Sequence, residues 1–508
     1  MTRALALLLV VASGAASADT LSDVRAAKTL RWGADAQGGA PYVFQDPMDP
    51  NRLVGFEVDL AQLLAKKLGV QARPVPGQWD KLLELLARGD FDVAINGLEV
   101  AEEKKRVCRL SRPYLEVPER LTIRRGDGQA PRTLEALAQR TVGTLPGSMA
   151  ARIAERAQAQ VKTYLGGQDE IYADLKLGRI DAVLLDAPVA RYYGDIDPAF
   201  ETVDADFGSV RYAVALRSDD EALAQAVDQA LGELIADGSL RAIYERWGVW
   251  SPQTAALFGD TRPPSTEPAV EFERWRAAVG HLPPFLERVR TRYPQVLPLF
   301  LRGAGLTLLV SVCAMVLAIA LGVTLAFSRR YGPAPVRWLA AAYIEFFRGT
   351  PLLVQLTLVY FGLPELDVRL SPFVAGVVAL GLNYAAAEAE NYRAGLESVA
   401  RGQLEAAQVL GLSRWQTLRF VVGPQALRIS IPPMTNDFIA LLKDSSLVSV
   451  VTLTELTTTY TTLANSMRDH LGLGALVALL YLLLGLPFAL LAQRVEAYFG
   501  RHLKRGEA

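Results

Sequence analysis

Two long apolar runs constrain the fold of this 508-residue chain more than any other feature. Residues 305–327 and 471–492 contain no charged side chain. At a rise of about 1.5 Å per residue, each run crosses the roughly 30 Å hydrocarbon core of a bilayer as a helix. A segment in lipid must satisfy its own backbone hydrogen bonds, so both runs predict transmembrane helices.

Three further candidate spans are shorter or carry charge. Residues 351–363 and 373–387 are apolar, and they become long enough only if they extend over 340–348 and 388–392. The fifth candidate, residues 431–456, is a poor one by hydropathy alone. Its charged residues are Asp437, Lys443, Asp444 and Glu455.

Charge decides how many of these segments cross. Arg329, Arg330 and Arg337 follow the first span, and the stretch of residues 493–508, which contains the predicted cytoplasmic tail of residues 496–508, is also basic. Basic loops stay in the cytoplasm. If the domain before the first span lies outside and the basic tail lies inside, the chain must cross the membrane an odd number of times. Five spans are predicted in a membrane domain of residues 298–495, because three would leave apolar runs unburied.

The N-terminus has the form of a secretory signal peptide, residues 1–18. Arg3 precedes a short apolar run at 4–12, and small residues at 16–18 form a cleavage site. A transmembrane anchor, the alternative, needs a longer run. The domain that follows is therefore expected outside the cytoplasm. The net charge of −1 argues against a nucleic-acid partner.

Residues 19–250 read as a soluble α/β domain in which strand-like and helix-like runs alternate. This pattern predicts a mostly parallel sheet covered by helices. Residues 85–97 resemble residues 174–186, which suggests two similar lobes. Ligands of open α/β sheets bind at the carboxyl ends of strands, so Asn96 and Asp186 are expected on opposite walls of one cleft.

Residues 251–297 are rich in proline and charge, which predicts a linker. One short amphipathic helix is expected near residues 271–279.

A polar segment, "LEAAQVLGLSRWQ" (residues 404–416), stands between the apolar runs on the predicted cytoplasmic side. Gly411 is placed to end one helix, and Ser413 with Gln416 has the form of a capping box for a second. Such a loop is either a simple connector or a docking element. The exposed anion of Glu405 and the small side chains of Ala406 and Ala407 favour docking.

The C-terminal region resembles the permease subunits of polar amino-acid ABC importers, over about residues 298–492. The stretches that carry this resemblance are "YIEFFRGTPLLVQLTLVYFGLP" and "SVARGQLEAAQVLGLSRWQTLRFVVGPQALRISIPPMTNDFIALLKDSSLVSVVTLTEL". The resemblance implies an all-α type I importer domain, in which Glu405, Ala406, Ala407 and Gly411 contact a cytoplasmic ATPase.

The soluble domain resembles the periplasmic amino-acid-binding proteins that serve such permeases. The matching stretches are "LVGFEVDLAQLLAKKLGV", "WDKLLELLARGDFDVAINGLEV", "SRPY", "VGTLPGS" and "GRIDAVLLDAPVARYY". The resemblance implies a two-lobe type II binding-protein fold, here fused to its own permease in a bacterial inner membrane. The binding domain would face the periplasm or the outside, and the C-terminus the cytoplasm.

The chain has no Gly-Lys dipeptide and hence no phosphate-binding loop of the G-x-x-x-x-G-K-[ST] kind. We therefore expect no enzymatic activity, cofactor or metal on this chain. ATP and Mg²⁺ belong to a separate ATPase dimer. The other expected partners are the bilayer, an amino acid or related solute, and a second permease copy, for which the fused receptor favours a homodimer.

An amino-acid site needs a cation for the carboxylate, a carboxylate for the ammonium group and a shaped wall. The resemblance implies that Asp186 binds the α-ammonium group of the ligand and that the Gly147–Ser148 turn donates to its α-carboxylate. It places Asp35 at a contact with the ligand side chain or ammonium group. Three aromatic side chains are candidate walls. The predicted solute-binding residues are Asp35, Tyr42, Phe44, Trp79, Asn96, Gly97, Leu98, Lys104, Ser148 and Asp186.

The carboxylate clamp departs from the family pattern. Where the family has Thr-x-x-Arg, this chain has Ala101 and Lys104, and lysine lacks the bidentate fork of arginine. Three interpretations are open. Lys104 binds the ligand carboxylate alone, the neighbouring Arg106 binds it in place of Lys104, or the ligand is not a standard α-amino acid. Glu99 would suit a cationic ligand, or it belongs to a solvated helix start.

Two other classes of protein join a ligand-binding domain to membrane helices. A ligand-gated ion channel predicts a re-entrant selectivity filter, which the sequence lacks. A sensory receptor needs a signalling domain after the last span. The roles of two membrane-region carboxylates, Glu388 and Glu390, stay open.

Overall fold

The computed structural model describes residues 20–164, 167–280 and 282–500. It divides into two compact units. Among the described residues, the binding unit comprises 20–297 together with Thr461–Leu473, and the helical unit comprises Pro298–Tyr460 and 474–500. The predicted signal peptide and residues 501–508 of the predicted tail lie outside the described residues.

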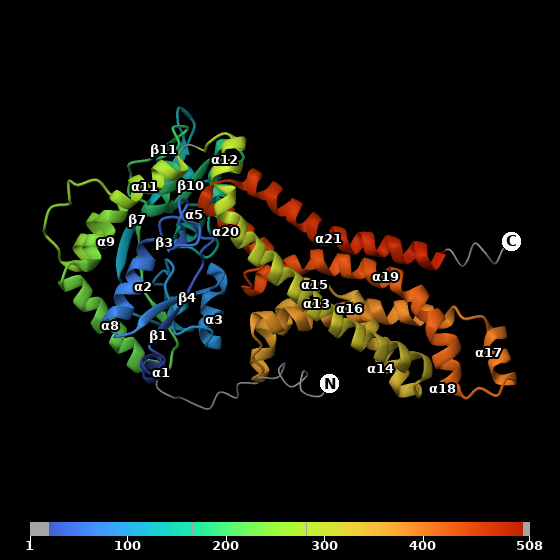
Figure 1. Ribbon diagram of the computed structural model, residues 1–508. Coiled ribbons are helices and arrows are strands. Elements are labelled where there is room, and N and C mark those ends of the chain that lie inside the picture. Colours follow the sequence, from blue (N-terminus) through green and yellow to red (C-terminus); the bar gives the residue numbers. More distant parts are fainter. Residues whose placement is uncertain (1–19, 165–166, 281, 501–508) are drawn as a thin grey trace. The chain divides into compact units, whose positions relative to one another are not determined.

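The first lobe of the binding unit is built on a five-stranded sheet of order β4-β1-β5-β13-β6. Helix α2 packs on β4 and β1 (Figure 1). Its buried side chains give the lobe much of its core. The strands are β1 (Thr29–Ala34), β4 (Gln71–Pro76), β5 (Val93–Ala94), β6 (Arg109–Leu110) and β13 (Ala215–Leu216). The helices are α1 (Thr20–Ala27), α2 (Phe56–Lys67), α3 (Leu82–Arg88), α4 (Glu102–Lys105), α8 (Glu221–Ala236) and α9 (Ser239–Trp247).

The second lobe carries a sheet of order β11-β7-β10-β8-β9, and β12 pairs with β7. A short hairpin of β2 (Phe44–Gln45) and β3 (Leu53–Val54) precedes α2 in the first lobe. The second-lobe strands are β7 (Leu115–Arg124), β8 (Thr141–Thr144), β9 (Gln160–Thr163), β10 (Ala182–Asp186), β11 (Phe200–Thr202) and β12 (Ser209–Tyr212). Its helices include α5 (Met149–Arg156), α6 (Gln168–Lys176) and the short α7 (Ala187–Val189).

Each sheet is less parallel than the sequence predicted. In the first, β4, β1 and β5 run parallel; in the second, β10, β8 and β9 do. The remaining pairings are antiparallel. The chain enters the second lobe along β7 and returns to the first lobe along β12 and β13. These crossing strands are not part of β-α-β units, and they pair antiparallel with their neighbours. Alternation of strands and helices cannot reveal these crossings.

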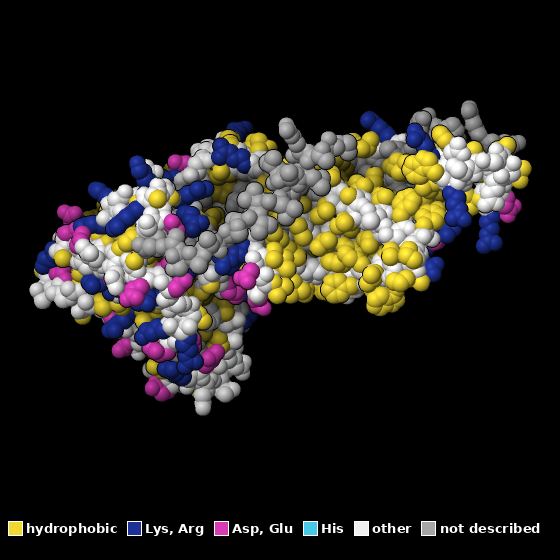
Figure 2. Space-filling view, turned by 90° about the horizontal axis from the view of Figure 1, so that it is seen from below, with side chains coloured by type: hydrophobic (Ala, Val, Ile, Leu, Met, Phe, Trp, Pro, Cys, Tyr) yellow, Lys and Arg dark blue, Asp and Glu magenta, His cyan; other side chains and the backbone are white. Residues whose placement is uncertain are grey.

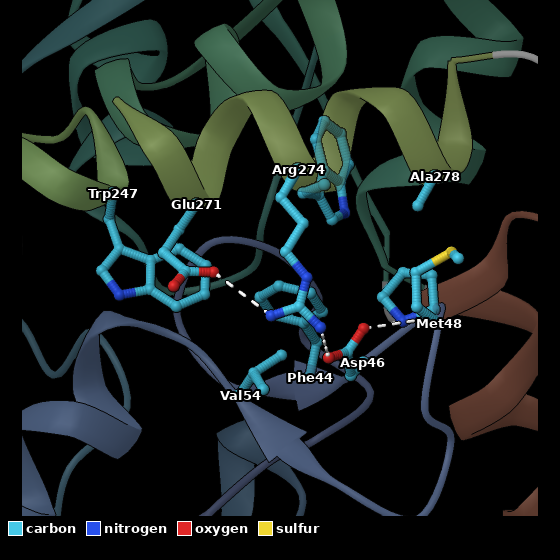
Figure 3. A pocket seen from close by; sticks show the side chains of 10 residues that line it. Phe44, Asp46, Met48, Val54, Trp247, Glu271, Arg274 and Ala278 are labelled. Atoms are coloured by element: carbon cyan, nitrogen blue, oxygen red, sulfur yellow. Dashed lines mark hydrogen bonds and ion pairs between the residues drawn. The ribbon is translucent and has the colours of Figure 1, made fainter. Parts of the chain in front are cut away.

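Residues 251–297 contain three short helices and the start of α13 at Tyr293, where the sequence predicted a linker with one helix. The three short helices are α10 (Pro252–Phe258), α11 (Val270–Val279) and α12 (Phe285–Thr291). Phe272 and Trp275 of α11 are buried against Tyr192, with ring centroids 4.9 and 4.7 Å away. Figure 3 shows Arg274 of the same helix reaching Asp46, at 2.6 Å. Helix α11 is therefore packed into the binding unit.

The helical unit contains the long apolar segments. Three described helices are long and apolar enough to span: α13, α16 and α21. A fourth candidate is the pair of α14 and Leu352–Leu366, which is bent by 105° at Thr350-Pro351. The predicted extension of residues 351–363 over 340–348 is therefore not one continuous helix. The helices are α13 (Tyr293–Tyr331), α14 (Ala334–Gly349), α15 (Leu352–Thr357), α16 (Pro372–Glu397), α17 (Arg401–Val409), α18 (Arg414–Thr417), α19 (Gly423–Asp444), α20 (Leu456–Met467) and α21 (His470–Gly500). The first residues of α13 and α21 and the second half of α20 belong to the binding unit.

The predicted span at residues 431–456 is not one helix. Helix α19 ends at Asp444, and a 3-10 turn, Ser445–Val451, follows. The number of spans, five, stays a prediction. In Figure 2, hydrophobic side chains form a band over the helices of this unit, as contact with lipid requires. Exposed examples are Leu309, Val312, Val316, Leu479, Leu482, Leu483, Leu486 and Leu490.

The carboxylates at 388 and 390 differ in their surroundings. Glu390 forms ion pairs with Arg329 of α13 and with Arg393, the latter at 2.7 Å. Glu388 is fully buried where α13 approaches α16. Gly322 permits this approach, because a Cβ there would lie 2.7 Å from the Cβ of Glu388 and 3.2 Å from the Ala385 carbonyl oxygen.

Gly322→Ala should therefore force α13 and α16 apart. Overpacking of this kind costs about 1–3 kcal/mol, so the thermal unfolding midpoint of the detergent-solubilised chain should fall by several degrees. Gly305→Ala in the same helix is the control, since nothing lies within 4 Å of its Cβ position. Equal midpoints for the two variants would contradict the close packing.

Candidate functional site

The first wall of the predicted cleft is made by the loops that follow β1 and β5. The Asp35 carboxylate accepts backbone hydrogen bonds from Gln37 (2.8 Å) and Trp79 (3.0 Å), and its own N–H donates to the Asn96 side chain. The Trp79 indole donates to the Asn96 carbonyl oxygen at 2.8 Å. Burial raises the pKa of Asp35 to about 6. Asp35 thus holds its own wall together.

Gly97 and Leu98 contribute backbone to this wall. The Gly97 N–H donates to Glu57 at 2.6 Å, and its φ of 56° with a Cβ position 3.2 Å from the Tyr42 ring favours glycine. Glu57, which the sequence did not single out, is buried, and burial raises its pKa to about 8. The Leu98 side chain is buried, and its carbonyl oxygen accepts from Ala213.

Asp186 lies on the second wall, where β10 ends, as the sequence predicted for a strand end. One carboxylate oxygen caps α7 by accepting from the Val189 N–H at 2.9 Å. The other accepts from the hydroxyls of Tyr42 (2.6 Å) and Tyr212. Tyr42 comes from the first lobe, so its bond to Asp186 joins the two walls. Burial raises the pKa of Asp186.

Ser148 caps helix α5. Its hydroxyl accepts from the Ala151 N–H at 3.1 Å and donates to the Leu145 carbonyl oxygen at 2.8 Å. The Ser148 hydroxyl, which was expected to donate to a ligand carboxylate, thus already donates its proton within the turn.

Glu99 makes a second contact between the lobes. Its carboxylate accepts from the Met149 N–H at the start of α5 (2.8 Å) and from the Arg152 guanidinium (2.9 Å), and the side chain is buried. The interpretation of Glu99 as part of a solvated helix start is wrong. A helix N-terminus and an arginine form an anion site, and here a protein carboxylate fills it.

Lys104 is a cation of the first wall that has no hydrogen-bond partner among the described residues. Its Nζ atom is buried and lies 5.3 Å from the centroid of the Trp79 ring. Burial lowers the pKa of Lys104, against the attraction of Glu99. Arg106, the alternative cation, has an exposed side chain at the end of α4.

Phe44 lies elsewhere. Its ring packs edge-on against Trp247, with centroids 5.9 Å apart. Figure 3 shows it at the base of a small hollow between the β2–β3 hairpin and α11, together with Met48 and Val54. The structure therefore places this predicted wall residue in the packing of α11.

The sequence reading missed Glu119 and Arg152. Glu119 lies on β7 directly opposite Asp186 of β10, and its side chain is 2% exposed. Neither residue stands in a motif. Arg152 matters only because the fold brings it to Glu99, and the sequence carries no signal of that contact.

The polar loop of residues 401–422 has the local structure that the sequence predicted. Gly411 follows α17 with a φ of 70°, and the Leu412 N–H closes the helix end on the Ala407 carbonyl oxygen at 3.0 Å. Ser413 and Gln416 form both bonds of a capping box.

The loop exposes a different set of side chains from the one expected. Glu405 and Ala406 are exposed, but Ala407 is 2% exposed. The contact of these residues with a partner stays a prediction. Apolar side chains project outward instead. They are Val409, Leu410, Trp415 and Phe420.

Comparisons with known proteins match the two units separately. Residues 30–249 match the family model of bacterial extracellular solute-binding proteins, family 3. Residues 318–502 match the binding-protein-dependent transport system inner membrane component.

Curated relatives cover the C-terminal part. The glutamine transport system permease protein GlnP of Escherichia coli is 37% identical over 202 residues, which cover 39% of this chain and 92% of GlnP. The probable amino-acid ABC transporter permease protein YckA of Bacillus subtilis is 39% identical over 184 residues, covering 36% of this chain and 81% of YckA.

Among solved structures, an ancestral arginine-binding protein bound to arginine is 34% identical, with a TM-score of 0.40; the match covers 43% of this chain and 98% of that protein. The chain belongs to the family of inner-membrane components of binding-protein-dependent amino-acid transport systems, and it carries its own family 3 solute-binding domain.

Proposed function

We propose that this chain is the solute-binding and permease subunit of an ATP-driven importer for polar amino acids. The observation that carries the proposal is the junction, in one chain, of a family 3 solute-binding domain and a permease whose relatives include glutamine, cystine and arginine systems. A transport subunit does no bond chemistry. Relatives of this kind disfavour an ion channel or a sensory receptor.

In the proposed binding mode, Lys104 attracts the α-carboxylate and Asp186 the α-ammonium group. The buried Lys104 Nζ atom lacks a hydrogen-bond partner among the described residues, so an incoming carboxylate supplies one. Asp186 already accepts from Tyr42 and Tyr212, and an ammonium group would share or replace those donors. Trp79 beside Lys104 supplies an apolar wall. This mode favours Lys104 over Arg106 as the cation.

The helical unit would deliver the solute in response to ATP. We propose that α17, Gly411 and α18 form a knuckle that docks on a cytoplasmic ATPase dimer, which holds ATP and Mg²⁺. Its exposed apolar side chains suit a protein groove better than water. The exposed Glu405 offers a charge for a cationic partner group. A second copy of this chain would complete the path. Arg329, Arg330 and Arg337 favour a cytoplasmic knuckle and C-terminus, with the binding domain in the periplasm.

Removing the Lys104 ammonium tests the binding mode. Lys104→Met should weaken binding of L-arginine and L-glutamine about 10- to 100-fold, since a hydrogen bond to a charged group is lost. Isothermal titration of the full detergent-solubilised chain measures this. Lys105→Met is the control, because Lys105 is exposed and pairs with Glu102. Wild-type affinity in Lys104→Met would rule out this carboxylate contact.

Distorting the knuckle tests the docking assignment. Gly411→Val places a β-branched residue at a φ of 70°, and Glu405→Lys reverses an exposed charge. Both variants should lose ATP-driven uptake into proteoliposomes and co-purification with the ATPase, while amino-acid binding stays unchanged. Gly402→Ala, with nothing within 4 Å of its Cβ position, is the control. Normal uptake in both knuckle variants would refute docking at this loop.

A further inference from the structure

Glu119 occupies an unusual position on the strand that connects the lobes. Residues Leu115–Pro118 of β7 pair with β12, and from Glu119 onward β7 pairs with β10. Glu119 is thus the first residue of β7 beside β10, directly opposite Asp186. Its side chain is 2% exposed, and the Oε2 atom has no hydrogen-bond partner among the described residues. A buried carboxylate oxygen without a donor is costly.

The carboxylates around Glu119 are already satisfied. Asp186 accepts from two tyrosine hydroxyls and one backbone N–H. Glu99 accepts from the Met149 N–H and the Arg152 guanidinium. Of these three carboxylates, Glu119 is the one with an unsatisfied oxygen in the described structure. The groups that act on its charge are Asp186 on β10, Glu99 after β5, Arg152 on α5 and the Tyr212 hydroxyl on β12.

A count of charges indicates which ligand this arrangement suits. Glu99 and Arg152 neutralise each other through their ion pair of 2.9 Å. Lys104 and Asp186 match the carboxylate and the ammonium group of a zwitterion. An ionised Glu119 is then left without a counter-charge, and burying such a group costs several kcal/mol. A neutral amino acid leaves that cost in place, whereas a ligand with a second cationic group removes it.

We propose that Glu119 is a specificity-determining residue that binds the cationic side-chain group of a basic amino acid. The inference rests on the proposed amino-acid function and narrows its substrate class to amino acids with a guanidinium or ammonium side chain. Without ligand, burial and the neighbouring Asp186 raise the pKa of Glu119. A ligand cation beside the carboxylate lowers that pKa again, and basic ligands therefore bind with release of a proton.

Titrations of the full-length chain with L-arginine and L-glutamine test the inference. The wild type should bind L-arginine more tightly than L-glutamine. Glu119→Gln should weaken L-arginine binding about 10- to 100-fold and change L-glutamine binding little, because only the arginine contact is charge-assisted. Glu116→Gln, on the same strand and paired with Arg211, is the control and should keep the preference. An unchanged preference for arginine in Glu119→Gln would overturn the inference.

A second measurement needs no variant. Titrating the wild type in two buffers of different ionisation enthalpy should reveal release of a proton on binding L-arginine and none on binding L-glutamine. Equal proton release for the two ligands, or none for either, would overturn the role of Glu119. A wild type that binds glutamine with equal affinity refutes the selectivity alone. A wild type that binds no L-amino acid refutes the proposed function as well.

Discussion

The carboxylate of Glu99, held by the start of α5 and by Arg152, is the contact on which the described form of the binding unit depends. It joins the lobe of β5 to the lobe of α5, and the Tyr42–Asp186 hydrogen bond supports it. It also takes an anion position that a solute could otherwise use. The buried Lys104 Nζ atom, by contrast, has no hydrogen-bond partner among the described residues.

The two units solve different solvation problems. In the binding unit, buried carboxylates are held by backbone N–H groups and phenols, as at Asp35 and Asp186. In the helical unit, an apolar band faces lipid, and polar groups need partners from neighbouring helices. Glycine is what lets α13 and α16 come that close, at Gly322. Glu390 of α16, for example, is paired with Arg393 of the same helix and with Arg329 of α13.

Features with a local cause were predictable from sequence. Gly411 and the Ser413–Gln416 capping box depend only on residues nearby, and the runs within α13 and α21 depend only on hydropathy. Features that need two distant segments were not. Arg152 is far from Glu99 in sequence, Glu119 follows an ordinary strand pattern, and the burial of Trp275 requires the surface of the second lobe. The amphipathic pattern near residues 271–279 predicted helix α11 correctly. The charge and proline of residues 251–297 indicated a linker, so the packing of α11 on the binding unit was not predicted.

The packing of α11 onto the binding unit also sets the length of the tether. Helix α12 and the first residues of α13, up to Leu297, belong to the binding unit as well, so the chain passes into the helical unit within α13. A short tether gives a domain an effective local concentration on the order of millimolar. Weak docking between receptor and permease would then suffice for transport. In a dimer of such chains, two tethered receptors would compete for the same translocation path, and turnover would depend on how fast one leaves.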